Sequence, residues 1–469
     1  MLFNSLTFVL FFGTVLALHA LPLPWRVRKL NLLLASYLFY AAWNPPFVLL
    51  LWLSTLVDWY VARALGRERR PRARRLLLLV SLATGLGLLG FFKYGDFLLE
   101  NFTRLLALAG VRFEPAAPGI VLPVGISFYT FQTLSYTLDV YRGAMRPWRS
   151  FLDYALYVAF FPQLVAGPIV RAGTWLPQCE APRRATPEQL GWGFALLAVG
   201  LFEKVILADT LLGPVADRVF ATPASAGFVG AWAGTLAFSG QIFFDFSGYS
   251  TCAVGAALCL GFRIPANFRF PYAAVGFSEF WRRWHVSLST WLRDYLYVPL
   301  GGNRGGPART YANLLLTMLI GGLWHGAAWH FVAWGGLHGL FLALERPFRA
   351  RLAGLRPALG ALPLMLVTYA GVCIAWVFFR APSVAGALDL LRAMAARGSG
   401  AVSLSALELS SVLGVTALLL AGQWWLRDTT LEEAAGRLPW WLRAAVLAGI
   451  LVALATSPGE NRAFIYFQF

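Results

Sequence analysis

The chain has 469 residues, of which 58% are hydrophobic and only 13% are charged. Soluble domains carry about 25% charged residues, so this composition excludes an ordinary soluble protein and predicts a polytopic membrane protein. In that setting the formal net charge of +17 indicates membrane orientation and contact with anionic lipid headgroups. We therefore expect membrane lipid, and no nucleic acid, as a partner.

The first apolar stretch, residues 1–20, lacks the positive residues that begin a signal peptide, so we expect an uncleaved first span. Two more apolar stretches flank an Asn-Pro-Pro turn at 44–46, and an arginine-rich run follows at 63–75. Because positive loops stay in the cytoplasm, this order predicts that the N-terminus lies outside. Later apolar runs lie at 76–92, 120–140, 151–170, 190–212, 228–244, 247–262, 310–345, 360–379, 403–425 and 440–456.

These runs predict an all-α polytopic membrane protein with about 11 or 12 transmembrane helices. The segment 263–309 between them is rich in arginine, which places it in the cytoplasm. Within it, SEFWRRWHVSLSTWLRDYLYVPL (278–300) repeats Trp, Leu and Tyr at steps of three or four residues. That spacing predicts one amphipathic helix in the inner membrane interface, broken at Pro299.

The run 310–345 leaves the cytoplasm and returns within about 35 residues, so one limb of the hairpin is expected to be short. Gly321, Gly322 and Gly326 are natural places for its helix to break. Broken backbone at membrane depth requires a protein-buried or water-filled site. We therefore expect His325 at the apex of a re-entrant hairpin, lining a pocket with a thin wall of glycine and alanine.

Three histidines of this hairpin, His325, His330 and His338, are five and eight residues apart. Zinc-binding histidines on one helix are usually three or four residues apart. Helical geometry turns His325 about 140° away from the other two, so we expect no metal site. His330 and His338 are expected to pack against a neighbouring helix with a hydrogen bond, whereas a histidine at a glycine-flanked break is more often functional.

Four motifs resemble the membrane-bound O-acyltransferase family, in particular its bacterial branch that acts in alginate O-acetylation and teichoic acid D-alanylation. The motifs are FPQLVAGPIVR (161–171), QIFFDFSGYS (241–250), FWRRWHVSLSTWLRDYLYVPLGGNR (280–304) and GGLWHG (321–326).

This resemblance implies one membrane domain over 1–469, with helices around a central tunnel, in the inner membrane of a bacterium with both termini in the periplasm. The domain divides into N-terminal spans (1–262), cytoplasmic interfacial helices (263–309), the histidine-bearing hairpin (310–345) and C-terminal spans with an aromatic tail (346–469).

The resemblance also implies acyl transfer from a cytoplasmic thioester, such as acetyl-CoA, to a hydroxyl across the membrane. His325 matches the family's active-site histidine, and His285 matches a second histidine on the cytoplasmic side. No cofactor is expected to stay bound, and a separate periplasmic acyltransferase is expected to complete transfer to the polymer. Thr251-Cys252 departs from the family pattern after FSGYS, without an expected effect on chemistry.

The residues suit this chemistry, because a neutral imidazole is a good base for a hydroxyl near neutral pH. The sequence leaves open whether His325 acts as the base or is itself acylated. The arginines Arg282, Arg283 and Arg293 are expected to bind either thioester phosphates or inner-leaflet lipids. Further candidates for the substrate site are Trp324 and Asp245, although an intramembrane aspartate more often has a structural partner.

The tail AFIYFQF (463–469) is too aromatic for water, so it is expected to bury in the interface or in a cavity. Its pattern Phe464-x-Tyr466-x-x-Phe469 resembles a C-terminal motif of a small companion protein in teichoic acid D-alanylation. By that resemblance Tyr466 would relay the acyl group to the periplasmic partner; otherwise it anchors the tail at the interface.

Other function classes remain open at this point. A transporter or scramblase would predict two similar halves with paired broken helices, and the sequence has no such symmetry. Alginate, another exopolysaccharide and peptidoglycan all remain as acceptors, and the acyl group itself is not fixed.

Overall fold

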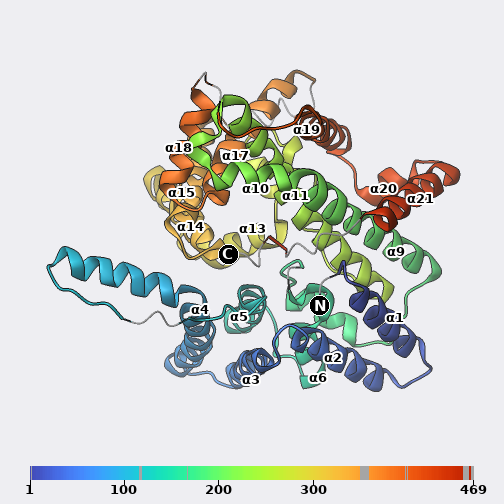
Figure 1. Cartoon of the computed structure of the whole chain (residues 1–469). Helices are drawn as coiled ribbons and strands as arrows, with labels where there is room; N and C mark the ends of the chain where they lie inside the picture. The colour runs from blue at the N-terminus through green and yellow to red at the C-terminus, as the bar shows by residue number, and fades with distance from the viewer. Residues whose placement is uncertain are drawn as a thin grey trace. The chain divides into compact units, whose positions relative to one another are not determined.

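The structure is a computed structural model that describes residues 1, 3–115, 119–165, 167–348, 359–396, 398, 400–457 and 464–465. All regular structure within these residues is helical, as expected from the sequence. The chain divides into two compact units, Met1–Gly193 with Ala256–Pro265 and Phe194–Gly255 with Ala266–Phe469. Figure 1 traces the helices from blue at the N-terminus to red at the C-terminus.

The first unit contains α1 (Leu6–Ala20), α2 (Trp25–Ala41), η1 (Pro45–Phe47), α3 (Val48–Leu65), α4 (Pro71–Leu108), α5 (Ile126–Arg142), α6 (Phe151–Ala159), α7 (Phe161–Leu164), α8 (Ala172–Trp175) and η2 (Leu176–Cys179). Helix α9 (Pro187–Phe202) leads from this unit into the second. The Asn-Pro-Pro turn predicted at 44–46 is confirmed, because η1 separates α2 from α3 there.

The second unit contains η3 (Glu203–Leu212), α10 (Gly213–Ala221), η4 (Pro223–Ser225), α11 (Gly227–Cys259), η5 (Pro271–Ala273), α12 (Phe277–Arg283), α13 (Val286–Leu292), η6 (Arg293–Tyr297), α14 (Gly306–His325), α15 (Trp329–Glu345), η7 (Arg346–Phe348), η8 (Leu359–Ala361), α17 (Leu362–Arg380), α18 (Val384–Ala395), α19 (Ala406–Leu426), α20 (Leu431–Gly436) and α21 (Trp440–Thr456). The last residues of α11 belong to the first unit. The segments η3 and η6 are π-helical.

Five helices of the described chain are long and apolar enough to cross a membrane, namely η1 with α3, α4, α11, α17 and α19. The apolar runs 228–244 and 247–262, expected as separate segments, form the single helix α11. Gly248 does not break it, because the glycine serves close packing: a Cβ there would lie 2.5 Å from the carbonyl oxygen of Gly200 on α9.

The prediction of one continuous amphipathic helix over 278–300 is wrong. The segment divides into α12, α13 and η6, and the chain turns at Trp284 and His285. His285 adopts a left-handed conformation with φ of 41°, which costs an L-residue about 1–2 kcal/mol. The turn is fixed from outside the helix, because the amide of Val286 donates to the carbonyl of Asn267 at 2.9 Å.

The hairpin predicted from the glycines is confirmed at one of them. Helix α14 ends at His325 and α15 begins at Trp329, and the two lie side by side (Figure 1). Gly326 is extended there, and its hydrogen faces the Phe331 ring, which would lie 2.0 Å from any Cβ. The helices are 20 and 17 residues long, so neither limb is markedly short.

Gly321 and Gly322, by contrast, stay helical within α14. A Cβ on Gly322 would lie 2.2 Å from the Phe331 carbonyl oxygen, and one on Gly335 would lie 2.2 Å from that of Met318. Small residues on both helices thus let the two backbones touch, as in other close helix pairs of membrane proteins. The glycines fix the position of His325 through packing, and only Gly326 ends the helix.

Candidate active site

His325 is the last residue of α14, and only 3% of it is exposed. Three aromatic rings surround its imidazole edge-on: Trp324 at 5.0 Å, Trp334 at 5.0 Å and Phe379 at 5.3 Å between centroids. The expected thin wall of glycine and alanine is therefore wrong at the ring itself, because large side chains from α15 and α17 fill that space. Such an apolar enclosure favours the neutral imidazole that a base requires.

His285 lies at the turn before α13 and is fully buried. Its Nδ1 lies 3.3 Å from Oδ1 of Asn267. Because an amide oxygen only accepts, Nδ1 carries the proton and Nε2 is the basic nitrogen. His285 lies outside the long apolar helices, and burial lowers its pKa to about 3, so this imidazole is neutral at physiological pH.

Asn267 organises this turn with five hydrogen bonds, one of which its Oδ1 accepts from the Ser287 amide at 3.4 Å. Besides His285, its Oδ1 accepts from the Ser287 hydroxyl at 2.7 Å, and its Nδ2 donates to the Ser250 hydroxyl at 3.3 Å. Its carbonyl holds Val286 as described above. The sequence analysis missed Asn267. The one available signal was that Asn267 stands in the same basic segment as the second histidine, 18 residues before it.

Trp324 links the two histidines. Its indole lies 6.1 Å from the His285 ring and 5.0 Å from the His325 ring. Two imidazoles from different segments are thus brought next to one buried indole. The structure therefore brings together His285, Trp324 and His325, three of the residues selected from the sequence.

His330 and His338 form separate contacts, as expected for packing histidines. Nδ1 of His330 lies 3.0 Å from the Phe378 carbonyl on α17. Nδ1 of His338 accepts from Nε1 of Trp281 on α12 at 3.3 Å. Each of these two histidines on α15 therefore forms a hydrogen bond with a different neighbouring helix, as predicted.

Helix α12 is joined to α15 at a second point, because Glu345 accepts from the Ser278 amide at 2.9 Å. A carboxylate in the first turn of a helix also compensates its unpaired amide groups. The contact between Trp281 and His338 lies about one turn further along α12. These two bonds place α12 in a defined position beside the hairpin that carries His325.

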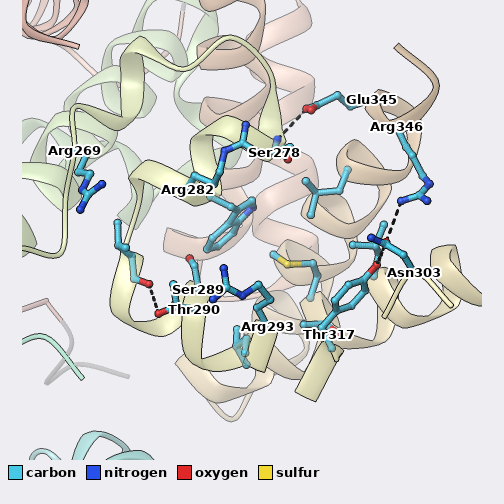
Figure 2. A pocket seen from close by; sticks show the side chains of 17 residues that line it. Arg269, Ser278, Arg282, Ser289, Thr290, Arg293, Asn303, Thr317, Glu345 and Arg346 are labelled. Atoms are coloured by element: carbon cyan, nitrogen blue, oxygen red, sulfur yellow. Dashed lines mark hydrogen bonds between the residues drawn. The ribbon is translucent and has the colours of Figure 1, made fainter. Parts of the chain in front are cut away.

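A cavity of about 490 Å³ opens between α12, α13, η6, α14 and the end of α15. Figure 2 shows Arg282 and Arg293 between Arg269 and Arg346, which lie on opposite sides of the view. Among the described residues that line the cavity, Glu345 is the one acidic side chain, and it accepts a hydrogen bond from the Ser278 amide. The cavity is therefore strongly positive, as required for a ligand with several phosphate or carboxylate groups.

His325 does not line this cavity. Trp281 forms part of the cavity wall and contacts Trp334 at 5.7 Å, and Trp334 in turn contacts His325. Two aromatic rings thus separate the charged cavity from the candidate base. This differs from the expectation that His325 itself would line a pocket, and the reason is the bulk of these two indoles.

Arg283 has a different environment from its neighbour Arg282. It pairs with Glu279 at 2.7 Å and donates to the carbonyls of Arg269 and Arg427. It does not line the cavity. We therefore assign Arg283 a structural role and leave it out of the substrate site.

Asp245 likewise has structural partners, which the sequence analysis favoured for it. Its Oδ1 pairs with Lys204 at 2.5 Å, and its Oδ2 accepts from the amide of Ile465 at 2.7 Å. Lys204 also pairs with Asp209 at 2.9 Å. The sequence analysis missed Lys204, because nothing near position 204 signals a partner 41 residues further along the chain.

The expected burial of the aromatic tail is confirmed at Phe464 and Ile465, which are 0% and 3% exposed. Tyr466, the candidate relay, lies outside the described residues. Among the described residues, no group of three or more His, Cys, Asp or Glu side chains has the arrangement of a metal site.

Residues 146–359 match the membrane-bound O-acyltransferase family. A probable alginate O-acetylase AlgI of Azotobacter vinelandii is 42% identical, over 90% of this chain and 83% of that protein. A peptidoglycan O-acetyltransferase of Helicobacter pylori is 38% identical, over 78% of this chain and 73% of that protein. A teichoic acid D-alanyltransferase of Streptococcus thermophilus is 28% identical, over 53% of this chain and 63% of that protein.

Proposed function

Because the chain belongs to the membrane-bound O-acyltransferase family and is a multi-pass membrane acyltransferase, we propose that it exports acetyl groups. It takes an acetyl group from a cytoplasmic thioester and passes it across the inner membrane for O-acetylation of an exported polysaccharide such as alginate. The observation that carries this proposal is the buried unit of His285, Trp324 and His325 beside a cavity rich in arginine.

The donor binds in the arginine-lined cavity, and acetyl-CoA suits it. Its phosphates would pair with Arg282 and Arg293, which are exposed within the cavity, and guanidinium groups bind phosphates with two parallel hydrogen bonds. Its pantetheine arm is narrow and uncharged, so it suits a path past Trp281 and Trp334 toward His325. The cytoplasmic position expected for the arginine-rich segment 263–309 would suit this direction.

His325 supplies the base for transfer. Its neutral imidazole takes the proton of the acceptor hydroxyl, and the oxygen attacks the thioester carbonyl carbon. The carbon–sulfur bond breaks, the ester forms, and the departing thiolate takes the proton from the imidazolium. A positioned base accelerates such a step by about 10²–10⁴. His285 stays neutral beside Trp324 and orients the donor side of the site.

Tyr466 is proposed as the first acceptor, which then passes the acetyl group to a separate periplasmic acyltransferase. The family resemblance of the tail supports this, as does the burial of Phe464 and Ile465 beside the residues around His285. Full acetylation of the polymer by Tyr466→Phe would reject the relay and leave the tail as an anchor.

The proposed function is tested in cells and in membranes. Deletion of the gene should abolish O-acetyl groups on the exported polysaccharide but not on peptidoglycan, measured by NMR of the purified polymers, and the wild-type gene should restore them. Inverted membrane vesicles should incorporate label from acetyl-CoA. Loss of acetyl groups from peptidoglycan alone would reject a polysaccharide acceptor, and unchanged acetylation of both polymers would reject the function.

The donor site is tested with two thioesters, acetyl-CoA and S-acetylpantetheine, which lacks the phosphates. The double variant Arg282→Gln, Arg293→Gln should raise KM for acetyl-CoA at least tenfold and leave KM for S-acetylpantetheine unchanged. Arg304→Gln is the matched control, since Arg304 is exposed but does not line the cavity. Equal effects on both donors would indicate that these arginines bind lipid headgroups instead.

A further inference from the structure

The C-terminal residues Phe464 and Ile465 are held in the interior of the second unit by a buried charge cluster. Lys204 contacts two carboxylates, Asp209 at 2.9 Å and Asp245 at 2.5 Å, and all three side chains are at least 92% buried. A single cation thus faces two carboxylates. The Ile465 amide adds a further donor to Asp245 at 2.7 Å.

A buried carboxylate that loses a hydrogen-bond donor is strongly destabilised. Departure of the tail would remove the Ile465 amide from Asp245 and leave Oδ2 without that donor. It would also expose the ring of Phe464, which is fully buried. The charge cluster and the aromatic contact therefore both hold the tail in place.

Phe464 lies one aromatic ring away from the second histidine. The Phe464 ring contacts Tyr249 at 4.8 Å and Phe246 at 5.8 Å. Phe246 in turn meets the His285 ring edge-on at 4.6 Å. Aromatic contacts therefore connect Phe464 to His285 through Phe246. The same series of contacts continues from His285 through Trp324 to His325.

We propose that Lys204 and Asp245 are positioning residues that clamp Phe464 and Ile465 against Phe246, next to His285, and that these two buried residues thereby seal the acyl-transfer site from water. This inference rests on the proposed function. A thioester in the site has two competing fates. Attack by the acceptor hydroxyl gives the ester, whereas attack by water on the same carbonyl carbon breaks the carbon–sulfur bond and releases free acetate and the thiol. The clamped tail favours the first.

The clamp itself is tested by digestion of the purified full chain with carboxypeptidase Y, which also releases proline, followed by intact mass measurement. In the wild type, digestion should stop before Ile465 is removed. Asp245→Asn weakens the ion pair, and Ile465→Pro removes the amide donor while Asp245 stays intact. Both should allow digestion past Phe464, whereas the control Ile465→Val keeps the amide and should match the wild type.

The seal is tested by the partition of label from acetyl-CoA between polymer ester and free acetate in membrane vesicles. Asp245→Asn and Ile465→Pro should each raise the ratio of acetate to ester at least tenfold, whereas a merely structural defect would lower both products together. An unchanged ratio after release of the tail would overturn the seal, and digestion that stops before Ile465 in both variants would overturn the clamp. If the wild type itself makes no ester, the proposed function fails, and the digestion still tests the clamp.

Discussion

The contact between α14 and α15 allows a sharp test of how the fold positions His325. A Cβ on Gly335 would lie 2.2 Å from the Met318 carbonyl oxygen and 3.2 Å from the Cα of Gly322. Ordinary contacts begin at 3.4 Å, so Gly335→Ala must separate the two backbones by about 1 Å. Overpacking of this kind costs about 1–3 kcal/mol, and a 1 Å displacement of a catalytic group lowers the rate by about 10²-fold.

The neighbouring glycine provides the matched control. A Cβ on Gly336 meets only the end of the Leu319 side chain, at 3.4 Å, and alanine gains about 1 kcal/mol of helix propensity. Acetyl transfer from labelled acetyl-CoA and the melting temperature in detergent should both fall for Gly335→Ala and stay near wild type for Gly336→Ala. Equal activity and stability of the two variants would refute the close-packed hairpin as the device that positions His325.

Two further predictions concern the supports of the site. Trp281→Phe keeps an aromatic side chain but removes the indole donor to His338. It should lower the free energy of unfolding by about 1 kcal/mol, measured by thermal unfolding. An unchanged free energy of unfolding would show that this hydrogen bond does not hold α12. Asn267→Ala removes the acceptor of His285 Nδ1 and should reduce the acetyl-transfer rate at least tenfold, a larger effect than Ser250→Ala, which removes only the outer hydrogen bond. Equal rates for Asn267→Ala and the wild type would exclude this orienting role.

The features predicted correctly from the sequence are local ones. The class of the protein followed from composition, and the break after His325 followed from the glycines next to a histidine in a long apolar run. The packing of His330 and His338 was also predicted correctly, although the angle that set them apart from His325 assumed one continuous helix, and α14 ends at His325. Each of these depends on residues within a few turns of one another, where spacing determines which face a side chain occupies.

The features that the sequence analysis missed depend on residues far apart in the chain. The rings around His325 include Phe379, which is 54 positions away. The left-handed turn at His285 interrupts a pattern of Trp and Leu that continues across it, and Asn267 fixes it from another segment. The runs 228–244 and 247–262 were expected as separate segments, yet they form one helix, in which Gly248 packs against Gly200 of α9. Composition alone does not distinguish a glycine that ends a helix from one that lets two helices touch.

The central claim is that His325, and not the other histidines of the hairpin, is the base for acyl transfer. The most direct measurement compares His325→Gln with His330→Gln in the same membranes, at matched protein levels, by incorporation of label from acetyl-CoA. We expect His325→Gln to lose about 10²–10⁴-fold in rate and His330→Gln to retain most of the wild-type rate, because its imidazole only bonds the Phe378 carbonyl. Near wild-type acetyl transfer by His325→Gln would contradict the account.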